Sequence, residues 1–335
     1  MTSSSELPSF DVNEIDEKIS KEGEYISGKE SSNKAIFKFV PNISKENLEN
    51  KDDNISFPKY FCEITAKDFK YIGILTNQLK RDLYGYSLMD NEDEFLGEYK
   101  NQIREGFGMY KFKSNEEKEE KEEKKEKEEK EEIYIGEYIN NKKEGKGMYL
   151  KINKSIKDDS NDNIILIDFD CNIGTFKDNI LQEGIIFSLK DNKETLYCGK
   201  LNELGEQEDT EAFYIEDKNK IFKGIITKGN MVEGRNIFIN DKYEKIKAYY
   251  FIINKKENTE GYEFDNNKNE EKDNECIDKA KELLDINHKK KIQEIFDMVN
   301  NNFKEFKEYE KAINIDFEND IKNKVKSELD NIIMN

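Results

Sequence analysis

The sequence predicts a mainly β chain with a C-terminal α-helical part. We expect an elongated, single-layer antiparallel sheet of stacked β-hairpins, followed by an amphipathic helix. Three observations predict this fold class. A glycine-containing phrase occurs twice with identical internal spacing, a glycine recurs at a short period through the middle of the chain, and the last part has apolar residues at helical spacing.

The repeated phrase is the most specific of these observations. Residues 95–99 (FLGEY) run on to residues 105–110 (EGFGMY), and residues 134–138 (YIGEY) run on to residues 144–149 (EGKGMY). In both copies the lead glycine and the first glycine of the second half are nine residues apart. This indicates a repeat array, and repeat arrays usually build extended binding surfaces rather than catalytic pockets.

The period of the array follows from its lead glycines. Most steps between them are 22 to 25 residues long once the charged run at 116–132 and the polar stretch at 154–163 are treated as insertions. A period this short suits one β-hairpin for each unit and is too short for a pair of helices. The lead glycines are Gly73, Gly97, Gly136, Gly174, Gly199 and Gly224.

The residue types within a unit predict two strands and a turn. Residues 133–139 and 146–152 are short and rich in aromatic and branched side chains, which favours paired strands, and residues 140–144 are a polar turn. The glycines either adopt backbone angles closed to other residues or let strands and rings approach closely. Because an isolated hairpin is marginal in water, we expect each unit to stack on its neighbours and bury its tyrosines.

This pattern resembles the MORN (membrane occupation and recognition nexus) repeat, a β-hairpin unit. The resemblance covers residues 69–264 and is strongest in the two copies of the phrase, although the chain has no Trp and most other units lack the second glycine. It implies repeat-defining, structural roles for Gly73, Gly97, Tyr99, Gly106, Gly108, Gly136, Tyr138, Gly145, Gly147, Gly174, Phe176, Gly184, Gly199, Gly224 and Gly234.

The chain is expected to have three parts. Residues 1–56 form a polar N-terminal segment in which residues 23–26 (GEYI) read as one eroded repeat, and residues 57–266 form the array. An insertion at 114–132 includes a run of 11 Glu and six Lys, predicted to be a solvated loop or frayed helix. Residues 267–335 form an amphipathic helical tail.

The tail has one apolar stripe and three interpretations. The helix caps the last hairpin of the array, or it binds a partner or a second copy as a coiled coil, or it lies on a membrane surface through the basic cluster at 288–291. The predicted partner-binding face is Ile292, Ile295, Val299, Phe303 and Phe306.

Composition limits the class of function. Charged residues make up 39% and hydrophobic residues 35%, and the net charge of -19 disfavours nucleic acid and anionic membranes as general partners. The four cysteines form no C-x-x-C pair, and His288 is the one histidine, so no zinc site is expected. The phosphate-loop spacing is absent around Gly145 and Gly147. We expect no enzyme, and no catalytic, cofactor-binding or metal-binding residues.

The expected function is that of a non-catalytic scaffold or adaptor that assembles protein partners. The resemblance implies a place at a cytoskeletal, ciliary or membrane-associated structure, often as dimers or larger assemblies. Two alternatives stay open: a regulatory subunit of a separate enzyme such as a lipid kinase, and a phosphoinositide-binding or membrane-binding module. The N-terminus has no signal region, and no apolar run reaches the length of a membrane span, so a cytoplasmic location is expected.

Overall fold

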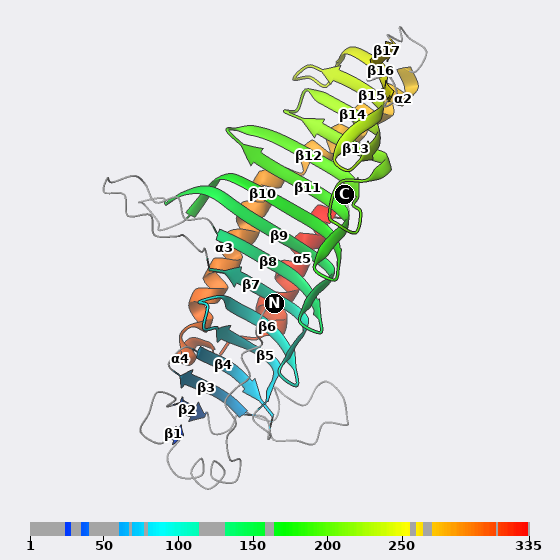
Figure 1. The fold of residues 1–335 in the computed structure, drawn as a ribbon. Helices are drawn as coiled ribbons and strands as arrows, with labels where there is room; N and C mark the ends of the chain where they lie inside the picture. Colours follow the sequence, from blue (N-terminus) through cyan, green and yellow to red (C-terminus); the bar gives the residue numbers. More distant parts are fainter. Residues whose placement is uncertain are drawn as a thin grey trace, which may run out of the picture. The chain divides into compact units, whose positions relative to one another are not determined.

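The computed structural model describes residues 24–27, 35–39, 60–66, 69–76, 80–113, 131–157, 164–254, 259–263, 270–312 and 314–333. The chain forms two compact units. Figure 1 labels the strands and helices that they contain. The first unit contains residues 1–115, 137–142 and 298–324, and the second contains residues 116–136, 143–297 and 325–335. Each unit therefore combines strands with residues from the C-terminal helical part, and neither unit corresponds to an array or a tail alone.

The first unit is built on antiparallel strands that pair in sequence order from β1 to β7. The strands are β1 (Glu24–Ser27), β2 (Ala35–Phe39), β3 (Tyr60–Ala66), β4 (Phe69–Leu75), β5 (Arg81–Leu88), β6 (Glu94–Lys100) and β7 (Ile103–Phe112). Two of them, β1 and β2, lie within residues 1–56, and β2 pairs with β3. The strand pairing therefore begins before residue 57.

The second unit has the same organisation, with antiparallel pairing in sequence order from β9 to β17. Its strands are β9 (Lys142–Lys157), β10 (Ile164–Lys177), β11 (Ile180–Lys190), β12 (Lys193–Lys200), β13 (Asp209–Glu216), β14 (Lys220–Thr227), β15 (Asn230–Ile239), β16 (Lys245–Asn254) and β17 (Thr259–Glu263). Strand β8 (Glu131–Ile139) contributes residues to both units.

The helices follow the strands. They are α2 (Glu270–Asp285), α3 (His288–Phe306), α4 (Tyr309–Ala312), the π-helical segment η2 (Phe317–Lys322) and α5 (Asn323–Ile333). The prediction of a mainly β chain of antiparallel hairpins followed by C-terminal helix is confirmed.

In the first unit, residues 298–312 and 314–322 cover one face of the strands. Tyr84 of β5 stacks on Phe317 with ring centroids 5.4 Å apart, and Tyr86 meets Phe303 edge to face at 6.2 Å. At the margin, Lys322 forms an ion pair with Glu98 of β6 at 2.8 Å. We call the face that these contacts define the helix-covered face, and the opposite one the open face.

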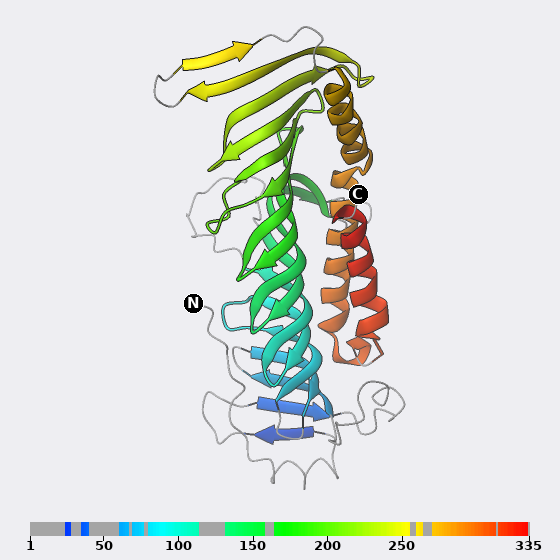
Figure 2. The ribbon, with the colours of Figure 1, turned by 90° about the vertical axis from the view of Figure 1, so that its right-hand side faces the viewer.

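The second unit is covered in the same way, and Figure 2 shows α2, the start of α3 and α5 on one side of its strands. Asp273 of α2 is fully buried, accepts hydrogen bonds from Arg235 of β15 and pairs with Lys245 of β16 at 3.1 Å. Gln293 of α3 exchanges hydrogen bonds with the backbone at 164 and 166 of β10, at 2.7 and 2.8 Å. Among the described residues, no helix lies on the open face (Figure 2).

The hairpin turns are shorter than the sequence predicts. The polar turn expected at residues 140–144 consists of Asn140 and Asn141 alone, because β8 ends at Ile139 and β9 begins at Lys142. Both turn residues have positive φ, 51° and 66°, which is the two-residue geometry that matches the twist of paired strands. Asn tolerates this conformation well. Because these two residues complete the turn, residues 142–144 belong to strand β9.

The predicted insertion at 114–132 also ends earlier than expected. Strand β8 begins at Glu131, so the last two residues of the charged run belong to a strand. The Glu132 carboxylate accepts a hydrogen bond from the Tyr149 hydroxyl of β9, which gives this residue a partner within the sheet. Residues 114–130, on which the prediction of a loop or frayed helix falls, lie outside the described residues.

Candidate binding surface

A row of glycines runs across the strands on the open face of each unit. In the first unit, Gly73, Gly85, Gly97 and Gly108 are direct cross-strand partners on β4 to β7. In the second unit the row passes through Gly147, Gly174, Gly184 and Gly199 on β9 to β12, Gly136 of β8 adjoins Gly147, and Gly224 pairs with Gly234 further on. We call these residues the glycine row.

Aromatic rings lie directly on the glycine row. The ring belongs to the residue two positions before a lead glycine, because residues i and i+2 of a strand face the same side. A methyl group on Gly108 would lie 2.5 Å from Cζ of Phe95, and one on Gly147 would lie 2.5 Å from the Tyr134 hydroxyl. Gly108 and Gly147 are therefore required by the close approach of the rings, whereas a methyl group on Gly174 or Gly184 would meet backbone atoms of the neighbouring strand.

Five of the predicted glycines have positive φ, and three of them, Gly136, Gly174 and Gly184, lie in the glycine row with φ of 155° to 159°. Gly106 and Gly145 are absent from the glycine row and have positive φ, 98° and 65°. A register shift separates Gly97 from Tyr99 in the β6–β7 pairing, opposite the segment that contains Gly106. The irregular pairing here uses the backbone freedom of glycine.

The remaining repeat-defining aromatic residues link neighbouring hairpins. Phe95 meets Tyr99 edge to face at 5.1 Å and Tyr138 at 5.5 Å, and in the second unit Tyr134 meets Phe176 at 5.2 Å. Such contacts stabilise by about 0.5–1.5 kcal/mol beyond the buried area. Burial raises the pKa of Tyr138, so its phenol stays neutral and acts as a packing group.

Basic side chains cover these rings, and the sequence reasoning missed them. The guanidinium of Arg81 lies 4.8 Å from the Tyr99 ring centre and that of Arg104 lies 5.0 Å from Tyr110, while the Lys143 ammonium lies 4.2 Å from Tyr149. Each basic residue stands four positions before a glycine of the row, namely Gly85, Gly108 and Gly147. This spacing was the available signal, and it indicates cation–π contacts built into successive hairpins.

A second repeated contact joins the turns of neighbouring hairpins. The Asn141 side-chain oxygen accepts from the Arg104 N–H at 2.9 Å, and the Asn179 side-chain oxygen accepts from the Lys143 N–H at 2.9 Å. The glutamate that begins the second half of the repeated phrase also accepts a hydrogen bond from the turn of the next hairpin. Glu105 accepts from the Asn140 N–H and Glu144 from the Asp178 N–H, both at 3.0 Å.

Beside the glycine row runs a second cross-strand row, which we call the aromatic row. In the first unit it is fully buried and consists of Tyr71, Ser87, Phe95 and Tyr110. In the second unit it consists of Tyr149, Asn172, Ile186, Tyr197, Tyr214, Phe222, Asn236 and Tyr249.

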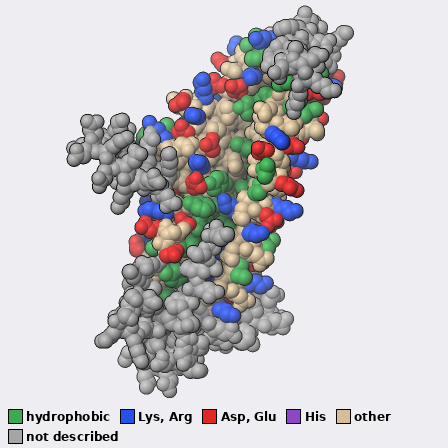
Figure 3. Space-filling model, viewed as in Figure 1, with side chains coloured by type: hydrophobic (Ala, Val, Ile, Leu, Met, Phe, Trp, Pro, Cys, Tyr) green, Lys and Arg blue, Asp and Glu red, His purple; other side chains and the backbone are tan. Residues whose placement is uncertain are grey.

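The aromatic row of the second unit is partly accessible. Tyr149, Ile186, Tyr214 and Tyr249 are half-buried, whereas Tyr197 and Phe222 between them are fully buried. Figure 3 views the open face and shows hydrophobic side chains along the middle of the strands, with Lys, Arg, Asp and Glu mainly toward the margins. An apolar centre with a charged rim is the usual anatomy of a protein interface.

The predicted partner-binding face of the tail is not accessible. Ile292 and Ile295 are fully buried in the second unit, and Val299, Phe303 and Phe306 are at most 2% exposed in the first. The physical reason is that the apolar stripe of the helix covers apolar strand residues of the same chain, such as Tyr84 and Tyr86.

Within the described residues, no group of three or more His, Cys, Asp or Glu side chains is placed to hold a metal ion. Cys62, Cys171, Cys198 and Cys276 are not in disulfides, and burial raises the pKa of the Cys62 and Cys171 thiols. None of the described helices is long and apolar enough to span a bilayer.

Comparison with protein families identifies the hairpins. Residues 95–116 and 134–155 match the MORN repeat, and these segments contain the β6–β7 pair and most of β8 and β9. None of the curated proteins compared with the chain matches it. The chain therefore carries MORN repeats, which indicate a protein-binding or membrane-associated repeat protein and are typically non-catalytic.

Proposed function

We propose that this chain is a non-catalytic scaffold that binds a partner protein on the open face of its second unit. The observation that carries the proposal is the partly accessible aromatic row, in which Ile186, Tyr214 and Tyr249 stand on a face that no described helix covers. Tyrosine supplies large contact area at low entropic cost and is enriched among the residues that dominate binding.

The surroundings of the row favour a protein over a bare lipid surface. Lys247 lies over Phe238 at 4.5 Å, and Lys220 is paired with Glu216 at 2.9 Å, so both signs of charge lie close to the apolar centre. Mixed charge selects a partner with complementary charges, whereas an anionic membrane requires a basic patch. A cytoskeletal, ciliary or membrane-associated structure is the setting that the repeat family suggests for this assembly.

A photo-crosslinking residue in place of Tyr214 tests the proposal in cells. We expect protein adducts from this position and few from the same residue in place of Lys228, an exposed turn residue that serves as the matched control. The variant Tyr249→Ser should reduce the Tyr214 adduct while the circular dichroism spectrum is unchanged. Mass spectrometry of the adduct then identifies the partner.

The alternatives predict other results. A stoichiometric kinase in the adduct would establish the regulatory-subunit function. Flotation of the protein with phosphoinositide vesicles, together with no protein adduct at Tyr214, would establish a membrane-binding module and overturn the scaffold.

A further inference from the structure

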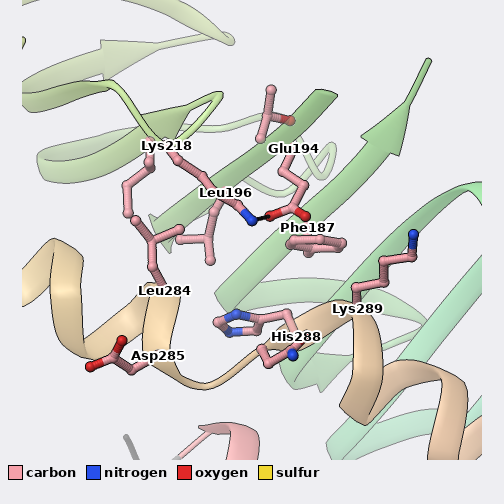
Figure 4. Close-up of a pocket in the computed structure, with 11 residues that line it drawn as sticks. Phe187, Glu194, Leu196, Lys218, Leu284, Asp285, His288 and Lys289 are labelled. Carbon is pink, nitrogen blue, oxygen red and sulfur yellow. Dashed lines mark ion pairs between the residues drawn. The ribbon is translucent and has the colours of Figure 1, made fainter. Parts of the chain in front are cut away.

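A hollow of about 250 Å³ lies in the second unit, between the helix-covered face of β11 to β13 and the junction of α2 with α3 (Figure 4). Its apolar wall is formed by Phe187, Leu196 and Leu284. Its polar groups come mainly from the junction, where His288 and Lys289 begin α3. The hollow is separate from the open face and from the aromatic row.

The helix is interrupted at this junction, and the N-terminus of α3 lies at the hollow. Helix α2 ends at Asp285, and Asn287 adopts a positive φ of 50°. The Asn287 side chain accepts from the Lys290 N–H at 3.2 Å, and its carbonyl accepts from the Lys291 N–H at 3.1 Å. Among the described residues, no backbone hydrogen bond is made by the N–H groups of His288 and Lys289. Such groups, together with the helix dipole, favour an anion.

The charges of the first turn of α3 are opposite to those that the helix dipole favours. The turn contains His288 and Lys289 to Lys291 and has no acidic residue. Lys290 and Lys291 lie 3.5 and 3.7 Å from Glu294, and Lys291 also pairs with Glu328 at 2.8 Å. Lys289 has no acidic partner among the described residues, although it lines the hollow. A first turn whose charges the helix dipole disfavours, with no acidic residue in that turn to offset them, is typical of a functional site.

The one histidine of the chain stands in the hollow without a hydrogen-bond partner. His288 is 3% exposed, its ring stacks on Phe187 with centroids 5.7 Å apart, and its Nε2 has no partner. Burial lowers the pKa of His288 to about 4, so the imidazole is neutral at pH 7. A buried polar atom without a partner costs free energy, and a bound ligand or water is the usual explanation.

Neither of the two acidic residues of the hollow, Glu194 and Asp285, neutralises the positive charge at the N-terminus of α3. Glu194 is paired with Lys218 at 3.1 Å, and the dashed line in Figure 4 marks this pair. Asp285 closes α2, and its carboxylate points away from the imidazole in Figure 4. The groups that remain beside the imidazole are the free N–H groups and the His288 ring itself. Lys289 is exposed, and in Figure 4 its ammonium points away from the imidazole.

We propose that this hollow binds the phosphoryl group of a small ligand at the N-terminus of α3, with the backbone N–H groups holding the anion, His288 hydrogen-bonding one of its oxygens and the exposed Lys289 side chain turning toward the bound anion. The apolar wall of Phe187 and Leu196 then receives the part of the ligand that carries the phosphate. The volume fits a group of this size and excludes a large ligand.

The single histidine makes the test specific. The imidazole signals of the full-length chain are recorded by NMR while inorganic phosphate, and separately a soluble phosphomonoester, is added at constant ionic strength. We expect a saturable shift of these signals and a rise in the pKa of His288 when the anion binds, because a nearby negative charge favours the protonated ring.

Two lysine variants decide whether the hollow is the site. Lys289→Gln should weaken binding about tenfold, the loss of one charge-assisted hydrogen bond. Lys290→Gln removes the same charge from the same turn but does not line the hollow, so affinity should stay within about twofold. Equal weakening by both variants would overturn the proposal. So would the absence of a saturable shift with both phosphate compounds, if the vesicles described next also show no flotation that depends on Lys289.

The same variants distinguish the source of the phosphoryl group. Vesicles of phosphatidylcholine with and without phosphatidylinositol phosphates are floated with each protein. Saturation by soluble phosphate compounds without flotation identifies a soluble ligand. Flotation that requires the phosphorylated lipid and is lost in Lys289→Gln, but kept in Lys290→Gln, identifies a lipid headgroup. Flotation equal in all variants, with no shift from soluble phosphate compounds, would refute the site.

Discussion

Single glycines determine how the rings of this protein pack. Gly97 and Gly108 are cross-strand partners, and the Phe95 ring lies across both, so that a Cβ atom on either would meet Cζ of Phe95 within 2.6 Å. Gly106, two residues before Gly108, has a positive φ instead and a different role. The spacing of the phrase predicts that Gly106 and Gly108 are both required. The structure gives the reasons: the Phe95 ring lies over Gly108, and Gly106 has a backbone conformation with positive φ.

The variant Gly108→Ala tests the ring contact. We expect a loss of about 1–3 kcal/mol in the free energy of unfolding, because the methyl group forces the Phe95 ring from its place. Urea denaturation measures the loss.

The partner variant Phe95→Leu provides the control. In a double-mutant cycle, the two changes together should cost less than the sum of the single changes, since the smaller side chain leaves room for the methyl group. Strict additivity would show that the ring is not what Gly108 accommodates.

At the scale of elements, the hairpins are joined by their turns as well as by their strands. Asn141 closes the β8–β9 turn and accepts a hydrogen bond from the Arg104 N–H, while its own N–H donates to the Arg104 carbonyl at 3.1 Å. The polar residues at 140–144 predict a turn, but this reciprocal link is not readable from them. It joins residues 37 positions apart, and only the stacking of hairpins brings them together.

Substitution of Asn141 separates the two contributions of this turn residue. Asn141→Gly keeps a residue that tolerates the positive φ and removes the two hydrogen bonds that the side-chain oxygen accepts from the Arg104 backbone N–H and Nε, so we expect a loss of at least about 0.5–1.5 kcal/mol. Asn141→Ala should cost about 1 kcal/mol more, because alanine is strained at this φ. Chemical denaturation gives both values.

Asn192 is the matched control for this experiment. It occupies the equivalent position of the β11–β12 turn, with a φ of 62°, and makes no side-chain hydrogen bond among the described residues. Asn192→Gly should therefore leave the stability nearly unchanged, whereas Asn192→Ala should show the backbone cost alone. A loss in Asn192→Gly as large as in Asn141→Gly would contradict the role of the link between hairpins.

At the scale of the whole molecule, the C-terminal helical residues belong to both compact units. Residues 298–324 are part of the first unit, and residues 270–297 and 325–335 are part of the second. Tyr84 and Tyr86 depend on this cover in the first unit, as Phe187 does in the second, where it stacks on His288. The helical part is therefore a structural component of each unit.

Deletion of residues 267–335 tests this role. We expect the shortened chain to lose cooperative unfolding and to elute as large aggregates in size-exclusion chromatography, because an exposed apolar face of this kind promotes association. The near-ultraviolet circular dichroism of its tyrosines should also weaken. A monodisperse, folded array without the tail would contradict this prediction and would restore the helix as a separable partner-binding element.

The sequence by itself determined the local design: glycines and aromatic residues at fixed spacing, hairpins in sequence order and an amphipathic helix after them. These features depend on contacts between residues close in the chain, where spacing decides which side chains share a face. The tertiary structure determined which strand residues the C-terminal helices cover. The stripe of Ile292, Ile295, Val299, Phe303 and Phe306 fits a partner or the chain's own strands equally well, and packing buried it in the chain. His288 showed no motif, and only the fold placed it in a hollow beside a helix N-terminus.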